Sequence, residues 1–367
     1  MKPLLTKVVV WLVMVNVFAP AAHNSFSLNQ ATAYTWITPE RFPVNQSFDL
    51  VDMHDRWDTH WYKEIVNNGY HLEQNDTLSD VVFFPLYPFL IKVVGTIFLG
   101  NYVLAGWLIS MAALIAGCAY LYALVREFHP EIDPELPVLL MLVFPTAFFF
   151  TIVYTEAIFF LFTVACFYYV FKKRFMTAGL FALFGALTHS NGVFLGLPIL
   201  WETVRLFGWK DALFSKRILP MTFPAIGMFS FLLYDYLKFR DFWLFFKIES
   251  AWGRSFSVNW EHFSTFSHPA IVNLCIDSAF TVLIIAAIVL VWKKLSPLYS
   301  VFMSLTVLAA LTSGTLMSIG RYSLVLFPLF ILLARIKNQT VLQAWIFGSV
   351  LFLAMDIVLF VNNYWAG

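Results

Sequence analysis

The chain has 367 residues, a formal net charge of +1, a mean hydropathy of +0.76 and only 12% charged residues. Soluble domains carry about 25% charged residues, so this chain has too few to cover a surface that faces water. We therefore expect an integral membrane protein. The nearly balanced charge argues against nucleic acid or another polyanion as a partner.

The first apolar segment covers residues 8–19, after Lys2 and Lys7 and before Pro20. A basic start, an apolar run and small residues are typical of a secretory signal peptide, and a retained signal anchor has the same pattern. We favour a retained anchor, because the rest of the chain predicts a membrane bundle against which it can pack. In both cases the residues after Ala22 are expected outside the cytoplasm.

Apolar runs that are long enough to cross a bilayer, or nearly so, recur along the chain and predict one all-α, polytopic transmembrane domain over residues 1–367. These runs, about eleven in number, lie at 4–22, 101–125, 137–152, 155–171, 176–188, 193–207, 218–237, 271–292, 297–313, 322–336 and 341–361. Segment 83–99 is interpreted as a helix on the outer face, because it contains Lys92 and two prolines. A crossing there would also invert every later loop.

Lysine and arginine mark the cytoplasmic side of a membrane protein. With these spans, the basic clusters all fall on one side: Lys2 and Lys7, Arg126, Lys172-Lys173-Arg174, Lys210 with Lys216 and Arg217, Lys293-Lys294, and Arg335 with Lys337. Two long loops, 23–100 and 238–270, then face outward with three short turns. Most of the unusual polar residues lie on this outward side, which predicts an active site there.

The densest group of charged and aromatic residues is the run 54–62 in the first outer loop. Asp58 lies at the start of a predicted interfacial helix, where a partly desolvated carboxylate suits a general base. Asp55, three residues earlier on the same helix face, competes for this role. The alternative is structural, with Asp58 as a helix cap beside an aromatic belt. That belt would consist of Trp57, Trp61 and Tyr62.

Other polar residues lie at the outer ends of the apolar runs. Glu156 and Arg321 are costly to bury in a membrane, so each is expected to face a cavity or to pair with the other. His189 and Asn191 lie at a predicted kinked helix end, where they serve either a site or local hydrogen bonding. Arg254 on the second outer loop can bind a phosphate bidentately or anchor the loop to lipid headgroups.

The sequence assigns no metal and no nucleotide cofactor. Asp52, Asp55 and Asp58 have a helical spacing that would hold a divalent ion only weakly. A P-loop and a dinucleotide-binding glycine pattern are both absent from the sequence, which argues against a cytosolic nucleotide-sugar site. The three cysteines lie in apolar runs and are interpreted as core residues.

Several of these residues belong to segments that resemble the GPI mannosyltransferase 2 (PIG-V) family and its prokaryotic relatives. The similar segments occur in the family's order, between about residues 55 and 330: Trp57-Asp58, Trp61-Tyr62 and Gly69-Tyr70, then Phe83-Phe84-Pro85-Leu86-Tyr87-Pro88, Phe144-Pro145-Thr146-Ala147-Phe148-Phe149, Tyr154-Thr155-Glu156, Thr188-His189-Ser190-Asn191-Gly192, Trp252-Gly253-Arg254, and Gly320-Arg321-Tyr322 with Phe327-Pro328. His189 departs from the family, which commonly has arginine before Ser-Asn-Gly. The chain has no large extra lumenal loops, and in this respect it is similar to the prokaryotic members of the family.

The resemblance implies an inverting glycosyltransferase of the GT-C type that uses a polyprenyl-phosphate sugar, here polyprenyl-phosphate-mannose. No cofactor is expected to be required, and the residues leave a divalent metal possible without indicating one. It implies that Asp58 deprotonates the acceptor hydroxyl, and that Arg254 and Arg321, with His189 as a third candidate, stabilise the departing phosphate. Glu156 would orient the acceptor sugar or hold Arg321. The further candidates for donor or acceptor binding are Trp57, Trp61, Tyr62, Asn191, Trp252 and Tyr322.

The expected acceptor is a lipid-linked or cell-surface glycan, in a reaction similar to those of GPI-anchor biosynthesis. The expected location is a prokaryotic plasma membrane with the site facing outside, or an endoplasmic reticulum membrane with the site facing the lumen. A transporter or flippase for a lipid-linked saccharide would share the helical bundle and the membrane-embedded charges. It would more often show two repeated halves, which the sequence does not show. A structural membrane subunit is a third reading, against which the outward clustering of polar motifs argues.

Overall fold

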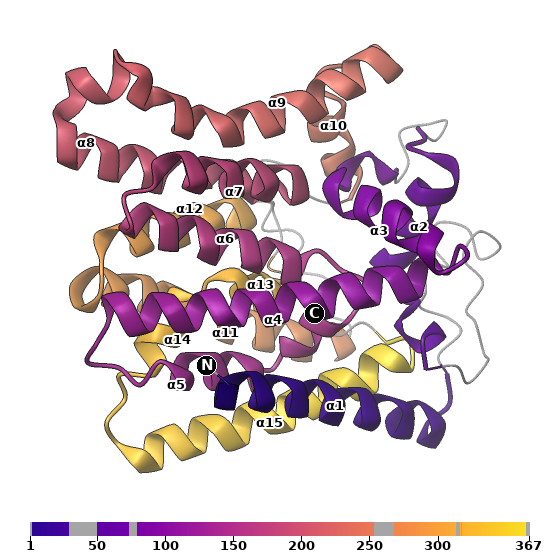
Figure 1. Ribbon diagram of the computed structural model, residues 1–367. Coiled ribbons are helices and arrows are strands. Elements are labelled where there is room, and N and C mark those ends of the chain that lie inside the picture. Colours follow the sequence, from indigo (N-terminus) through magenta and orange to yellow (C-terminus); the bar gives the residue numbers. More distant parts are fainter. Residues whose placement is uncertain are drawn as a thin grey trace.

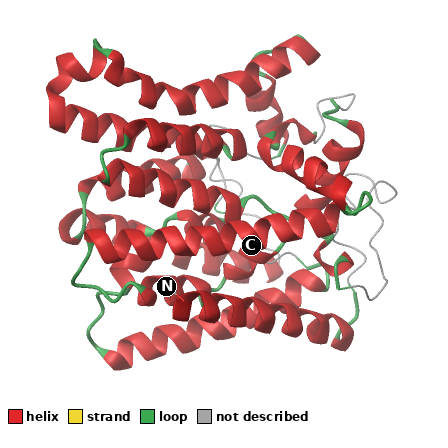
Figure 2. Cartoon of the chain, in the orientation of Figure 1, coloured by secondary structure: helices red, strands yellow, loops and turns green. Residues whose placement is uncertain are grey.

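The computed structural model describes residues 2–28, 50–72, 79–252, 268–312, 316 and 318–364. Within these residues the regular secondary structure is helical, with no strand (Figures 1 and 2). A chain whose apolar runs lie in lipid must satisfy its backbone N–H and C=O groups internally, and a helix does so within one segment. The prediction of an all-α bundle is confirmed.

Five stretches of the described chain are long and apolar enough to cross a membrane. They are α1 (Lys2–Ser25), α4 (Tyr102–Phe128), the stretch Lys216–Phe239 that ends with α9 (Leu219–Phe239), the greater part of α11 (His268–Lys294), and α15 (Gln339–Val361). With the composition of the chain, these stretches make it an integral membrane protein.

The other predicted spans are short or broken. The shorter helices are α6 (Glu156–Phe171), α7 (Phe175–Thr188), α8 (Gly196–Leu213) and α12 (Pro297–Leu311). Segment 137–152 is divided into α5 (Glu135–Leu142) and η3 (Ala147–Thr151), and segment 322–336 into η7 (Ser323–Val325) and α14 (Pro328–Leu333). Pro145 and Pro328 stand at the two breaks, where the missing N–H interrupts a helix. The predicted count of about eleven spans is therefore not confirmed.

Three short helices gather at one end of the bundle, called here the α2 end (Figure 1). They are α2 (Asp58–Asn68), α3 (Leu86–Ile97) and α10 (Leu244–Ala251). The 12 residues of α3 rise about 18 Å, less than the roughly 30 Å thickness of the hydrocarbon core. Helix α3 is thus shorter than a membrane crossing requires, and the place of segment 83–99 on the outer face stays a prediction.

Ion pairs join the helix ends at the other end of the bundle, called here the basic end. The side chain of Lys7 pairs with Glu135 and that of Lys172 with Glu127. Nη1 of Arg335 lies 3.2 Å from Glu131 and donates a 2.7 Å hydrogen bond to the carbonyl of Lys294. The basic clusters predicted to share one side of the membrane thus meet at one end, opposite the α2 end (Figure 1). Which end faces the cytoplasm stays a prediction.

Helix α1 packs along α15 and against α4, and lies beside α15 in Figure 1. Its buried residues recur every three or four positions and form one helix face: Leu4, Val8, Leu12, Val15, Ala19 and Ala22. The amide of Asn362, just after α15, donates a 3.3 Å hydrogen bond to the carbonyl of Ala22. This packing is the kind that a retained anchor would form, and it brings the end of α1 to the α2 end.

Candidate active site

Asp58 is the first residue of α2, and its backbone is held firmly in place. Its N–H donates a 3.0 Å hydrogen bond to the hydroxyl oxygen of Tyr154, from the turn before α6. The preceding residue, Trp57, has φ 52° and ψ −121°, a conformation that L-residues rarely adopt. Helix α2 is fixed by Trp61, which is fully buried and stacks on Phe83 with 6.0 Å between ring centroids. The carboxylate of Asp58 therefore starts from a fixed backbone position at the α2 end.

Arg321 brings the carboxylates of two distant segments together. It lies in the short helix α13 (Ile319–Tyr322), and Nη1 donates a 3.1 Å hydrogen bond to Oδ2 of Asp58. Its Nε lies 3.2 Å from Oε1 of Glu156, the first residue of α6. The side chains of Arg321, Glu156 and Asp58 are 7%, 10% and 17% exposed, so Asp58 is the most accessible of the three. The prediction that Glu156 and Arg321 pair with each other is confirmed.

Aromatic rings surround the guanidinium group of Arg321. Its central carbon lies 5.4 Å from the ring centroid of Tyr154 and 5.3 Å from that of Tyr322, with Phe149 at 5.5 Å. Cations are attracted to aromatic faces at such distances, more strongly where water is excluded. The rings and the two carboxylates together stabilise a buried positive charge that would otherwise be costly.

The turn after α7 places His189 opposite this group. Nδ1 of His189 accepts a 3.2 Å hydrogen bond from the backbone N–H of Asn191, so a neutral ring carries its proton on Nε2. The ring stacks on Phe159 with 5.1 Å between centroids. A Cβ on Gly192 would lie 2.3 Å from the backbone of α7, so only glycine fits where this turn folds back on the helix. The motif Ser-Asn-Gly thus has a local structural role that positions His189.

These residues line one cavity of about 290 Å³, close to the lower end of the size range of ligand pockets, about 300 Å³. Eight predicted site residues lie on its wall: Trp57, Asp58, Tyr62, Glu156, His189, Trp252, Arg321 and Tyr322. They come from five separate parts of the chain, so the fold brings together residues that are far apart in the sequence. We call this space the polar cavity.

A second cavity of about 280 Å³ adjoins the polar cavity. The two share four lining residues, namely His189, Ser190, Glu249 and Tyr322. Beyond them the wall is mostly apolar and comes from η4 (Ser190–Leu195), α9, α10 and α12. We call it the apolar cavity. Asn191 lies on its wall and not on that of the polar cavity.

Two predicted residues that the structure describes, Asp55 and Trp61, are not on either wall. The carboxylate of Asp55 pairs with Lys63 and lies 3.3 Å from Nδ1 of His60, so its competing role as a base has less support from its position than that of Asp58. Trp61 packs behind the wall, with Trp252 5.3 Å away edge-on. Arg254, and the side chain of Asp52, lie outside the described residues.

The structure also adds residues that the sequence reading missed. Glu249 on α10 lines both cavities, and Ser318 and Ser190 line the polar cavity. In the sequence Tyr154 is only part of a motif, whereas in the structure it contacts both Asp58 and Arg321. The position of Tyr154 two residues before Glu156 is a sequence signal that it belongs to the site. Glu249 has no such signal, because it lies in a short stretch that resembles an amphipathic surface helix.

The described residues contain no group of three or more histidine, cysteine, aspartate or glutamate side chains placed to hold a metal ion. Of the aspartates with the striped spacing, Asp55 faces Lys63 and Asp58 faces Arg321. The side chain on which Asp58 and Glu156 converge is a guanidinium group.

Comparison with protein-family models finds no match, and comparison with curated proteins finds none either. Among solved structures, the chain is similar to the archaeal oligosaccharyltransferase AglB from Archaeoglobus fulgidus in complex with an inhibitory peptide and a dolichol-phosphate, with a TM-score of 0.42 and 12% identity. It is also similar to the Archaeoglobus fulgidus oligosaccharyltransferase in the apo form, with a TM-score of 0.45 and 12% identity. Each match covers 97% of this chain and 56% of the other.

The chain therefore spans little more than half the length of these solved chains. TM-scores below 0.5 at 12% identity are too low to assign a family or an activity. Membership of the GPI mannosyltransferase 2 family stays a prediction from the sequence motifs.

Proposed function

We propose that the protein is an inverting glycosyltransferase of the GT-C type, which transfers a sugar from a polyprenyl phosphate to a lipid-linked or cell-surface glycan. The observation that supports this most is the polar cavity, where the carboxylate of Asp58 and the guanidinium group of Arg321 lie 3.1 Å apart. A group that can accept a proton and a group that can bind an anion thus share one small space beside an apolar one.

In the proposed reaction Asp58 is the general base. It takes the proton of an acceptor hydroxyl while the hydroxyl oxygen attacks the anomeric carbon of the donor. The bond between that carbon and the phosphate oxygen breaks, and the polyprenyl phosphate leaves with the bonding electrons. Because attack and departure occur on opposite faces, the anomeric configuration inverts. One carboxylate at the site of attack is sufficient, with no covalent enzyme intermediate.

Arg321 is proposed to bind the departing phosphate, where negative charge develops. In the structure its charge is balanced by Asp58 and Glu156. Binding of a phosphate would draw the guanidinium group away from Asp58 and leave the oxygens of that carboxylate open to the acceptor hydroxyl. Glu156 would keep Arg321 in place. Arg254, His189, Trp252 and the other predicted binding residues are proposed to contact the donor or the acceptor.

The apolar cavity is proposed to hold the polyprenyl chain next to the phosphate. Its wall is mostly apolar, and it joins the polar cavity at His189 and Tyr322. A lipid-linked donor requires this adjacency, because its charged group and its apolar chain are covalently joined. Mannose as the sugar is proposed from the sequence resemblance.

The α2 end is proposed to face the outside of a prokaryotic plasma membrane, or the lumen of the endoplasmic reticulum if the chain is eukaryotic. The basic end carries Lys172, Lys294 and Arg335, which the positive-inside rule places in the cytoplasm. A reporter fused after Arg174 should then be active on the cytoplasmic side, and one inserted at residue 75 on the opposite side. Reporters at both positions on one side would contradict the proposed orientation.

The deciding experiment supplies purified protein in detergent or vesicles with radiolabelled polyprenyl-phosphate-mannose and a panel of glycolipid acceptors. Formation of a labelled glycolipid with inverted anomeric configuration supports the proposal, and the same assay with polyprenyl-phosphate-glucose tests the choice of sugar. Movement of the intact donor between leaflets, with no new glycosidic bond under any acceptor, would instead indicate a flippase.

A further inference from the structure

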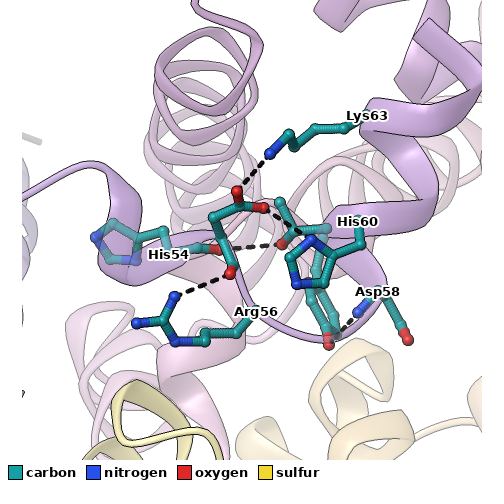
Figure 3. Close-up of polar contacts among 8 residues, drawn as sticks. His54, Arg56, Asp58, His60 and Lys63 are labelled. Carbon is teal, nitrogen blue, oxygen red and sulfur yellow. Dashed lines mark hydrogen bonds and ion pairs between the residues drawn. The ribbon is translucent and has the colours of Figure 1, made fainter. Parts of the chain in front are cut away.

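Residues 54–60, on both sides of Asp58, include titratable side chains that are nearly or fully buried, and the proposed reaction uses none of these neighbours of Asp58. Arg56 is 1% exposed, His54 2%, and Asp55 and His60 each 7%. Charged side chains are rarely buried unless they are paired. Figure 3 shows them as a network beside Asp58, whose side chain points away from Lys63 and from the network. Such a concentration of buried titratable groups requires a reason other than surface solubility.

Arg56 connects this segment to a distant helix. Its Nη1 donates a 3.0 Å hydrogen bond to the carbonyl of Asp55, and its Nη2 lies 3.4 Å from Nε2 of His23, near the end of α1. A guanidinium group can only donate, so Nε2 of His23 accepts, and its ring is neutral with a proton on Nδ1. The carbonyl of Arg56 also accepts a 3.2 Å hydrogen bond from the N–H of Thr59, in the first turn of α2.

The residues around Arg56 are held independently. Asp55 pairs with Lys63, one turn into α2, and lies 3.3 Å from His60 (Figure 3). His54 stacks on Trp107 of α4 with 5.1 Å between ring centroids, and its carbonyl accepts a 3.0 Å hydrogen bond from the hydroxyl of Thr59. The carboxylate of Asp55 therefore has a cationic partner of its own, and removal of Arg56 would not leave it without one.

Trp57 lies between two anchors and has the unfavourable backbone conformation noted above, with φ 52°. On one side is Arg56, joined to α1, and on the other is the N–H of Asp58, joined to Tyr154. A strained backbone persists only where the surrounding contacts determine it. The two anchors supply those contacts, and the strained turn sets the direction in which α2 begins and Asp58 projects.

We infer that Arg56 is a positioning residue, which joins the end of α1 to the strained turn at Trp57 and so fixes Asp58 in the polar cavity. This inference extends the proposed function, because it assumes that Asp58 acts there. It also gives α1 a part in the active site, since His23 holds the outer end of Arg56. Arg56 itself is not on the wall of the polar cavity, so its effect passes through the backbone.

The first test measures the turn directly and needs no substrate. Hydrogen–deuterium exchange of the full-length protein in detergent is compared for the unsubstituted chain, Arg56→Gln and His23→Ala. We expect amides of residues 54–60 to exchange at least several-fold faster in both variants. Arg335→Gln is the matched control, because Arg335 also donates to a backbone carbonyl, that of Lys294, but at the basic end.

The second test asks whether the effect passes through Asp58. A misplacement of about 1 Å in a reacting group costs up to about 100-fold in rate, so Arg56→Gln should lower kcat roughly 10- to 100-fold with little change in the KM of polyprenyl-phosphate-mannose. In the Asp58→Asn background the same substitution should change the residual rate less than about twofold, because the group that it positions is gone. Arg56→Lys should restore part of the rate.

The outcomes separate this inference from the proposed function. Full activity of Asp58→Asn would contradict the assignment of the base, whatever the behaviour of Arg56. If Asp58→Asn is inactive, and Arg56→Gln lowers its residual rate by the same factor as it lowers the rate of the unsubstituted protein, the positioning role of Arg56 is overturned. Unchanged exchange at residues 54–60 in Arg56→Gln would overturn it too. If Arg56→Gln does not fold, His23→Ala gives the same readouts, since it removes the partner and leaves the arginine.

Discussion

Two arginines fourteen positions apart show how differently one kind of contact is used at the two ends of the bundle. Arg321 at the α2 end is 7% exposed and contacts two carboxylates, one on α2 and one on α6. Arg335 at the basic end is 35% exposed, and its partner Glu131 is 48% exposed. Solvent screens the second pair and not the first. The comparison indicates that the arrangement around Arg321 serves a purpose other than fastening helices, which the exposed pairs already do.

The difference in burial between the two arginines follows from how the helices end. At the α2 end several segments stop short or break, as α13 and η7 do before Pro328, and their backbone and side chains line cavities. Irregular backbone at membrane depth is tolerated where it is buried in protein or lines a cavity. At the basic end the helices run to the bundle surface, and their charges meet water.

The largest expected effect is that of Asp58→Asn. The substitution preserves shape and removes the proton acceptor, so we expect turnover to fall on the order of 100-fold or more with folding intact. The measurement is the rate of transfer from radiolabelled polyprenyl-phosphate-mannose, with the melting temperature in detergent as a check on folding.

Asp55→Asn is the matched control for this effect. Asp55 is three residues away and faces Lys63, outside the polar cavity, so its substitution should cost less activity. A greater loss in Asp55→Asn than in Asp58→Asn would transfer the role of base to Asp55.

The second effect is expected from Arg321→Lys. Lysine keeps the charge and loses the planar group that contacts Asp58 and Glu156 together. We expect donor use, measured as kcat/KM for the lipid donor, to weaken by about 1.5–3 kcal/mol, the scale of a charge-assisted hydrogen bond. Acceptor saturation should change little. Arg335→Lys should leave both unchanged, and an equal loss in the two variants would remove the contrast between the ends.

Much of this arrangement could be predicted from the sequence, for a physical reason. The sequence predicted that Lys172, Lys294 and Arg335 lie at the same end of the bundle. Basic clusters alternate with apolar runs along the chain, and the packed helices keep these clusters on one side. The costly membrane charges Glu156 and Arg321 were expected to face a cavity or to pair with each other, since burial demands one or the other, and the structure shows both.

Other features depend on contacts that leave no trace in a local pattern. The role of Tyr154 arises from its reach to Asp58, and that of Glu249 from its position between two cavities. The network of Arg56 with His23 joins residues 33 positions apart. The span count was also beyond the sequence alone, because helices that break at Pro145 and Pro328 have the same hydropathy as continuous ones.

A third effect concerns the pH dependence of stability, and it comes from two buried histidines at the α2 end, His54 and His60. Burial, together with the charge of Arg56, lowers the pKa of His54 from its usual 6.5 to about 3. Burial lowers the pKa of His60 to about 4, although the nearby Asp55 carboxylate opposes this shift. Both groups lie at the α2 end, and both are neutral in the folded protein near pH 7.

The direction in which the free energy of unfolding changes with pH follows from the number of protons that each state binds. Between pH 6.5 and about 4 the unfolded chain binds protons at these two positions that the folded protein does not, so the free energy of unfolding falls as pH falls. Each histidine contributes up to about 1.4 kcal/mol per pH unit. The melting temperature in detergent should therefore decrease from pH 7 to pH 5. His54→Phe keeps the ring that stacks on Trp107 and cannot be charged, so it should flatten the profile. A profile that is as steep as before would exclude His54 as a source.

The smallest effect is expected from Arg335→Gln. This substitution removes an ion pair of 3.2 Å with Glu131 and a 2.7 Å hydrogen bond to the carbonyl of Lys294. Exposed pairs contribute about 0–1 kcal/mol, because solvent screens the charges and two long side chains lose rotamer freedom. We therefore expect a small fall in the free energy of unfolding, and no change in kcat or in donor KM. A loss of several kcal/mol, or a loss of activity as large as that of Arg321→Lys, would mean that the basic end is coupled to the polar cavity, and the two ends could no longer be treated as separate regions of the protein.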